Sequence, residues 1–355
     1  MNTNLKRNIG IFRIFLILFL PNLFLLNGAD IYLKRQIYSM NEDDCIFKRA
    51  TEFVIIGKEL FIIENFKGRF FKYQIKNNTL SSVKIMANRG QGPGDLYLPI
   101  HICATNDMLI IKDEIGLSYF KKDGTFVNKF RVVSPILSFA PVNDKIVLLQ
   151  SIPDNPILFN LYENNGRMIK GFGEKFLKID YSKSKDVDTL SVITYFYEGK
   201  VLSDKKYIYY FNSQFGQVFV FDFNGKKIME KDISPLFGDS GKYILKKNIE
   251  YLEHGIIKKD GSYSVYSFFR NVEIFGNEFY ILGRNKSEDE AKSLISTFFI
   301  LVLNKNTLTM EKKYLIKFEK GEAIYNFAIG DRNGAPYFLT FMETTEDSEF
   351  VEFKK

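Results

Sequence analysis

The chain offers few side chains that could hold zinc or act as a nucleophile and base. It has only two histidines, His101 and His254, and two cysteines, Cys45 and Cys103. Two of each at these spacings do not supply the three or four ligands of a zinc site. His101 lies in the apolar stretch PIHIC, which is typical of a core histidine. No G-x-S-x-G elbow, phosphate loop or kinase motif occurs, so the sequence favours a protein that is not an enzyme.

Three oxygen-bearing side chains are the remaining candidates for metal chemistry. Glu64, Asp113 and Asn212 are each followed by a glycine three or four residues later, at equivalent places in three repeated segments. Calcium and magnesium prefer such oxygen ligands, and the ion could polarise a carbonyl or activate water. The alternative function is therefore a Ca- or Mg-dependent hydrolase of the lactonase or esterase type. We favour the interpretation in which these residues cap turns through local N–H groups and no cofactor is bound.

These residues belong to a series of short strand-like segments. An aromatic or apolar anchor stands four residues before a turn glycine or asparagine, as Phe120 stands before Gly124. The five such anchors, and a sixth that falls where the series would continue, are Tyr73, Phe120, Tyr162, Phe221, Val302 and Phe353. Strand-rich repeats of about 40–50 residues are typical of propeller blades. The sequence predicts an all-β, six-bladed β-propeller over residues 30–355.

The two ends of this repeat region are expected to pair. The last blade, Ala323–Phe353, contains only three strand-like runs, whereas Ile31–Met40 (IYLKRQIYSM) belongs to no blade. We expect Ile31–Met40 to supply the missing outer strand and close the ring. Closure removes the two sheet edges that would otherwise be exposed.

Residues 1–29 have the pattern of an export signal. Lys6 and Arg7 precede the apolar run Ile14–Leu26, and the small residues Gly28 and Ala29 follow it. We expect a signal peptide and a periplasmic or extracellular protein. An uncleaved N-terminal anchor is the alternative, and it would be the only membrane contact. A bridge between the two cysteines is permitted in such a compartment but not required.

The net charge of +7 does not indicate a nucleic-acid partner. Three of these charges lie in residues 1–29, and no run rich in Lys and Arg occurs. We therefore expect no nucleic-acid binding.

The longest connections are predicted to lie on one face of the propeller. They are about Glu174–Glu198, Lys231–Gly261 and Arg284–Leu294. Loops on a rigid scaffold commonly carry binding residues. Tyrosines in these connections could contact a protein or glycan ligand bound by a monomer: Tyr181, Tyr195, Tyr197, Tyr243 and Tyr251. The alternative is that these rings cover neighbouring blades.

The most specific local motif is RGQGPGDL, Arg89–Leu96. Its turn residues are Gly90, Gly92, Pro93, Gly94 and Asp95. No helix is expected after it, so a tight turn between blades is favoured over a phosphate-binding loop. With Asp113 ahead of a third strand, this motif resembles a family of exported bacterial six-bladed propellers related to NHL-repeat proteins. The resemblance implies fold and export rather than a particular reaction.

Overall fold

The structure, a computed structural model, describes residues 31–40, 50, 52–132, 135–150, 155–177, 194–254, 266–284, 298–316, 322–343 and 348–354. Ile31–Lys355 forms one compact unit. Residues 1–29 and Cys45 lie outside the described residues, so the predictions of signal cleavage and of a cysteine bridge stay predictions. Within the described part of the chain, no helix is long and apolar enough to cross a membrane.

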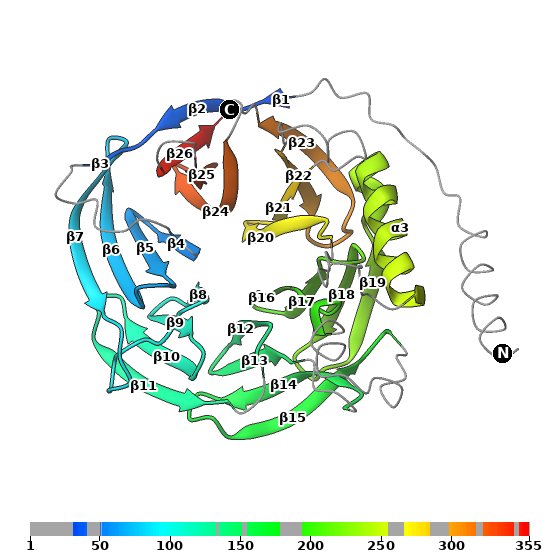
Figure 1. Cartoon of the computed structure of the whole chain (residues 1–355), viewed down its shortest axis with the longest axis horizontal. Coiled ribbons are helices and arrows are strands. Elements are labelled where there is room, and N and C mark those ends of the chain that lie inside the picture. Colours follow the sequence, from blue (N-terminus) through cyan, green and yellow to red (C-terminus); the bar gives the residue numbers. More distant parts are fainter. Residues whose placement is uncertain are drawn as a thin grey trace, which may run out of the picture. The chain divides into compact units, whose positions relative to one another are not determined.

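Six sheets form a closed ring, and the four strands of each blade are antiparallel, with the innermost strand at the centre of the ring and the outermost at the rim (Figure 1). Blade 1 is β4 (Glu52–Ile56), β5 (Glu59–Glu64), β6 (Arg69–Lys76) and β7 (Thr79–Ala87). Blade 2 is β8 (His101–Ala104), β9 (Met108–Lys112), β10 (Gly116–Lys121) and β11 (Phe126–Arg131). Blade 3 is β12 (Ser138–Val142), β13 (Lys145–Leu149), β14 (Ile157–Glu163) and β15 (Met168–Glu174).

The remaining blades follow the same order. Blade 4 is β16 (Gly199–Ser203), β17 (Tyr207–Asn212), β18 (Gln217–Asp222) and β19 (Lys227–Asp232). Blade 5 is β20 (Phe269–Phe275), β21 (Glu278–Arg284), β22 (Phe298–Asn304) and β23 (Met310–Ile316). Blade 6 is β24 (Ala323–Arg332), β25 (Ala335–Glu343) and β26 (Ser348–Lys354), completed by β2 (Lys34–Ile37). The predicted all-β, six-bladed propeller is therefore confirmed.

The predicted closure of the ring by Ile31–Met40 is also confirmed. The strand β2 pairs antiparallel with β26, from Lys34 opposite Lys354 to Ile37 opposite Val351. On either side of it, β1 (Ile31–Tyr32) pairs parallel with β23, and β3 (Ser39–Met40) pairs parallel with β7. The segment thus contacts three consecutive blades, which the sequence analysis did not predict.

A buried carboxylate fixes this closure. Glu352 on β26 is fully buried and accepts a hydrogen bond of 2.5 Å from the Tyr38 hydroxyl. Both of its oxygens also accept hydrogen bonds from Arg332, each at 2.9 Å. Hydrogen bonds to an ionised group are stronger than neutral ones, and the paired guanidinium offsets the cost of burying the charge.

All six sequence anchors lie in third strands, where they pack between blades. Phe221, for example, contacts Phe159 of blade 3 with ring centroids 5.3 Å apart. The pairing of β18 with β19 shifts register beside Phe221, which lets the following turn reach the preceding blade. At that turn Gly225 has φ +74°, and a Cβ built on it would lie 2.6 Å from the Phe172 side chain. The anchor-to-turn spacing therefore encodes how neighbouring blades dock.

The connection between β19 and β20 contains a short 3₁₀ helix, η3 (Ser234–Phe237), and the helix α3 (Gly238–His254). Ser240, Ile244 and Asn248 are buried and four residues apart, so they share one face of α3. Asp239 in the first turn complements the helix dipole. The sequence analysis expected an insertion here but not a helix.

Candidate functional site

The three longest connections leave the blades on one face, as predicted. They join β15 to β16, β19 to β20, and β21 to β22. Because neighbouring strands are antiparallel, links from strand two to strand three and from one blade to the next emerge at the same end of the sheets. We call the face that carries these three connections the insertion face.

The helix α3 is fixed to the insertion face by a buried amide. Asn248 Nδ2 donates to the carbonyl oxygens of Gln214 and Tyr266, both at 2.7 Å, and its Oδ1 accepts from Tyr266 N at 3.1 Å. All these partners are backbone groups, so the contact satisfies polar atoms that would otherwise be buried without hydrogen bonds. Ile244 adds an apolar contact with the core between blades 4 and 5.

The predicted ligand-contacting tyrosines fall into different environments. Tyr197 is fully buried, and its hydroxyl donates to Leu177 O at 3.0 Å, so it does not present its ring to a ligand in this structure. Tyr243 and Tyr251 both lie on α3. Tyr243 is partly buried against Tyr266, and Tyr251 is partly buried against the cluster of Phe196 and Phe215. Tyr195 is 44% exposed. Tyr181 lies outside the described residues.

One exposed ring on the insertion face was missed by the sequence analysis. Phe66 lies in the turn between β5 and β6 and is 66% exposed. Its neighbour Asn65 anchors the turn, since Asn65 Nδ2 donates to Pro99 O at 3.0 Å. The signal in the sequence is an aromatic residue where a turn normally carries polar ones.

The proposed oxygen ligands all have local partners. Glu64 Oε2 accepts from Arg69 Nη2 at 2.6 Å and from Arg69 Nε at 3.0 Å. Asp113 Oδ2 accepts from Lys129 Nζ at 2.7 Å, and its Oδ1 accepts from the backbone of the following turn. Asn212 Oδ1 accepts from the N–H groups of Gln214 and Phe215 in the same way.

These contacts are those of turn-capping residues. Over the part of the chain that the structure describes, no three His, Cys, Asp or Glu side chains lie close enough together to hold a metal ion. Nothing in this geometry favours the calcium or magnesium hydrolase.

The glycine-rich motif forms a closed turn between β7 and β8. Gly90 N donates to Leu96 O at 3.2 Å, and Asp95 N donates to Gly92 O at 3.1 Å. The Asp95 carboxylate accepts from Gly92 N at 3.1 Å, and a Cβ on Gly90 would come within 2.2 Å of that carboxylate. No described helix follows directly, so the geometry is that of a turn between blades.

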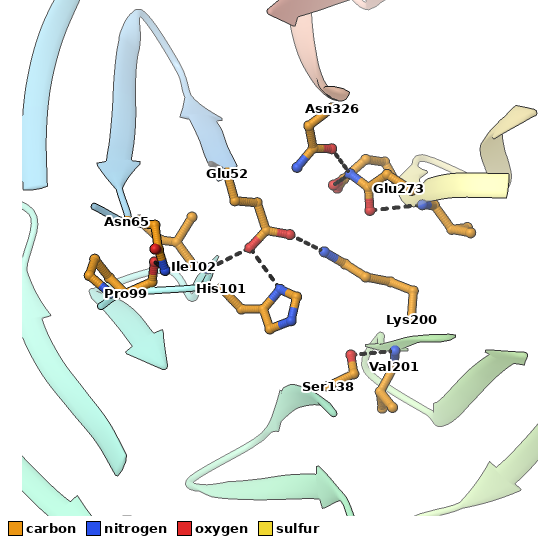
Figure 2. Close-up of polar contacts among 12 residues, drawn as sticks. Glu52, Asn65, Pro99, His101, Ile102, Ser138, Lys200, Val201, Glu273 and Asn326 are labelled. Atoms are coloured by element: carbon orange, nitrogen blue, oxygen red, sulfur yellow. Dashed lines mark hydrogen bonds and ion pairs between the residues drawn. The ribbon is translucent and has the colours of Figure 1, made fainter. Parts of the chain in front are cut away.

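A second polar cluster lies at the centre of the ring, where the innermost strands begin (Figure 2). Glu52 on β4 accepts from Lys200 Nζ of β16 at 2.7 Å and from Ile102 N at 2.6 Å. His101 Nδ1 lies 3.4 Å from the same carboxylate. These residues are the first or second of their strands, and each inner strand is entered from the insertion face. This part of the cluster therefore lies towards that face.

A second carboxylate, that of Glu273, lies on the opposite side of the cluster and has fewer hydrogen bonds than Glu52. Glu273 Oε1 on β20 accepts one hydrogen bond, from Asn271 Nδ2 at 3.0 Å. Asn271 Nδ2 also donates to Asn326 Oδ1 at 2.7 Å and to Phe327 O at 3.1 Å. A single amide thus shares its donors among three acceptors, two of them on β24.

The two carboxylates differ in their protonation. Burial would raise the pKa of Glu52, but attraction to Lys200 and His101 lowers it to about 2. Burial raises the pKa of Glu273 to about 7, although Lys200 attracts its charged form. Burial also raises the pKa of the Cys103 thiol, so this group stays neutral. At neutral pH the cluster holds one ionised carboxylate paired with lysine and one that is partly protonated.

The cluster borders a cavity of about 240 Å³ at the centre of the ring, which we call the channel cavity. The walls of this cavity come from the inner strands of all six blades. Besides the polar cluster and the hydroxyl-bearing Ser138 and Ser203, the lining includes half-buried aliphatic side chains: Val54, Ile55, Leu202, Ile274 and Ile329.

A larger groove of about 800 Å³ lies on the face opposite the insertion face, over turns of blades 2 to 5. Four charged residues line it, and two of them, Asp204 and Lys305, form an ion pair. Asp204 Oδ2 lies 2.8 Å from Lys305 Nζ and accepts from the Tyr209 hydroxyl at 2.9 Å.

Comparison with known proteins identifies the fold. No protein-family model matches the chain, and no curated protein matches it. A solved Bacteroides fragilis protein named as exported superposes with TM-score 0.55 at 12% identity, covering 92% of this chain and 96% of that chain. A member of the DUF4221 family from Bacteroides vulgatus gives TM-score 0.51 at 10% identity, covering 92% and 98%. The WD40 domain of Neurospora crassa Pan2 gives 0.50 at 6% identity, covering 86% and 89%.

These similarities show the β-propeller fold. The resemblance to exported six-bladed propellers is confirmed at the level of fold, while the relation to NHL repeats stays a prediction.

Proposed function

We propose that this chain is an exported, non-enzymatic binding protein that holds a protein or glycan ligand on its insertion face. One observation carries the proposal. Among the described side chains, the exposed aromatic rings are Phe66 and Tyr195, and both belong to connections on this face. Aromatic rings supply large contact areas at binding surfaces, and tyrosine adds a hydrogen-bonding group.

The scaffold supports this use of the face. The closed ring holds the connections on a rigid frame, and Asn248 fixes α3 to it through three hydrogen bonds. The exposed side of α3 includes Ile249, which is 39% exposed. Loops and helices presented on a rigid scaffold are common sites of recognition.

Export is part of the proposal. The basic start and apolar run of residues 1–29 support it, as does the similarity to a protein named as exported. N-terminal sequencing of the native protein after cell fractionation tests it. We expect an extracytoplasmic protein that either begins near Asp30 or retains its N-terminal segment; a cytoplasmic protein beginning at Met1 would contradict export.

Ligand capture by paired variants tests the binding face. The double variant Phe66→Ala/Tyr195→Ala removes both exposed rings, whereas Val127→Ala/Ile169→Ala removes exposed apolar groups from the outer strands β11 and β15. Each protein is screened on a glycan array and against extracytoplasmic proteins of its own cell. We expect a ligand that binds wild type and the outer-strand variant but is lost, by tenfold or more, from the aromatic variant. Retention of every ligand by the aromatic variant would refute the assignment of this face.

A further inference from the structure

The polar cluster in the channel has an unbalanced charge. Its carboxylates are Glu52 and Glu273, and Lys200 is the lysine between them. Lys200 Nζ lies 2.7 Å from Glu52 Oε1, and the two side chains are 19% and 7% exposed (Figure 2). Lys200 is thus committed to Glu52, while Glu273 has its one hydrogen bond from a neutral amide, Asn271. A carboxylate in such surroundings is stabilised by an added cation.

The channel cavity beside Glu273 has room for a small molecule. Its volume of about 240 Å³ is slightly below the roughly 300–1,000 Å³ of pockets that hold drug-sized ligands. Solvent reaches the cluster, because the side chain of His101 is 33% exposed. The apolar walls beyond the cluster, such as Ile274 and Ile329, favour an aliphatic rather than a polar body.

We propose that the channel cavity binds a small molecule with a protonated primary amine on a short alkyl body, and that Glu273 is its counter-ion. The ammonium group would donate to Glu273, and the alkyl body would lie along the apolar walls. This site is separate from the insertion-face contact proposed above and uses none of its residues.

Other ligand classes fit the channel less well. A divalent metal ion needs several oxygen ligands, and among the described residues no three acidic, histidine or cysteine side chains are grouped to hold one. An anion would have to draw Lys200 from Glu52, which would leave a buried carboxylate unpaired. A neutral alcohol would leave the Glu273 charge uncompensated.

Binding of an ammonium ligand should strengthen as the pH rises. With a pKa of about 7, Glu273 is about one-tenth ionised at pH 6 and about nine-tenths ionised at pH 8. An alkylamine remains protonated over this range, as lysine does. The charged groups that face Glu273 keep their charge over this range. Lys200 and Glu52 stay ionised, and the Cys103 thiol stays neutral.

Calorimetry with n-butylamine, n-butanol and butyrate tests the proposal on the whole chain. We expect n-butylamine to bind about tenfold more tightly at pH 8 than at pH 6. We expect n-butanol and butyrate to bind at least tenfold more weakly than the amine at pH 8. Equal binding of all three probes, or no binding of the amine, would overturn the proposal.

A matched pair of variants locates the site. Glu273→Gln keeps an acceptor for Asn271 and should fold, whereas Glu230→Gln removes a carboxylate from the exposed outer strand β19. We expect Glu273→Gln to lose at least tenfold in amine affinity together with the pH dependence, and Glu230→Gln to match wild type. Thermal melting confirms folding of both. Unchanged affinity in Glu273→Gln, or a pH dependence that survives it, would assign the effect to another group and refute the role of Glu273.

Discussion

Lys200 on β16 and Glu52 on β4 form an ion pair across the centre of the propeller, with Nζ and Oε1 2.7 Å apart. The two strands belong to blades 4 and 1, which lie opposite each other in a ring of six. In sequence the residues are 148 positions apart. The pair therefore links two blades that share no sheet, and it does so in a place where an unpaired charge is costly.

We predict that Lys200→Met destabilises the protein by about 3–5 kcal/mol, because it leaves the buried Glu52 carboxylate without its cation. Chemical denaturation of the variant and of wild type measures the difference. The control is Glu52→Gln/Lys200→Met, in which glutamine still accepts from Ile102 N. If the double variant were as unstable as Lys200→Met, loss of lysine packing rather than an unpaired charge would explain the effect.

Glu198 should make the protein less stable at alkaline pH. Burial raises its pKa to about 7, so the folded state binds the proton more tightly than the unfolded state, whose value is near 4.5. Stability is therefore lost as the pH rises from about 4.5 to about 7, and the loss persists above that range. We predict that Glu198→Gln raises stability by about 1–3 kcal/mol at pH 8 and leaves it unchanged at pH 4. Melting curves at both pH values decide; a gain of equal size at both would show that ionisation is not the cause.

Alanine substitutions at two glycines distinguish the energetic cost of a steric clash between blades from the cost of backbone strain. Gly225 and Gly276 have φ of +74° and +58°, but only Gly225 has a neighbour that a new Cβ would strike, the Phe172 side chain at 2.6 Å. In each alanine variant, the left-handed backbone conformation should lower the free energy of unfolding by about 1–2 kcal/mol. We predict that Gly225→Ala lowers the free energy of unfolding by about 1–3 kcal/mol more than Gly276→Ala does, because the new methyl group overpacks against blade 3. Urea unfolding measures both, and equal losses would contradict a steric role for Phe172.

The fold could be predicted because its spacing rules are local. Phe221 and Gly225 are four residues apart since one packs between blades and the other turns against the preceding blade. The same rule holds at Phe120 and Gly124, where a Cβ on the glycine would lie 3.1 Å from Met86 of blade 1. A few residues of sequence in each repeat are therefore enough to predict how that blade packs against its neighbour.

The channel cluster could not be predicted in this way. Glu52, Lys200 and Glu273 come from three blades and occupy no shared position in the repeat, so only ring closure brings them together. The helix α3 was missed for another reason. Two of its three buried positions at four-residue spacing are Ser240 and Asn248, so no apolar period marks its inner face.

Local sequence also could not predict which aromatic side chains are exposed to solvent. Tyr195 and Tyr197 are two residues apart in one connection, yet one is 44% exposed and the other is fully buried. Composition identified both as large amphipathic rings. Which of them faces solvent depends on the contact of Tyr197 with Leu177, a residue that precedes it by 20 positions.

Because β2 pairs with β26, the last step in folding of the propeller must follow synthesis of the final strand. The strand β3 can pair with β7 as soon as the ribosome has delivered blade 1, whereas Tyr38 must wait for Glu352, 314 residues later. Until then β2 and the growing last blade each keep an unpaired sheet edge, which is a site for association with other chains. The ring becomes complete only after translation has reached Lys354, so a nascent chain released before that residue remains open at this seam.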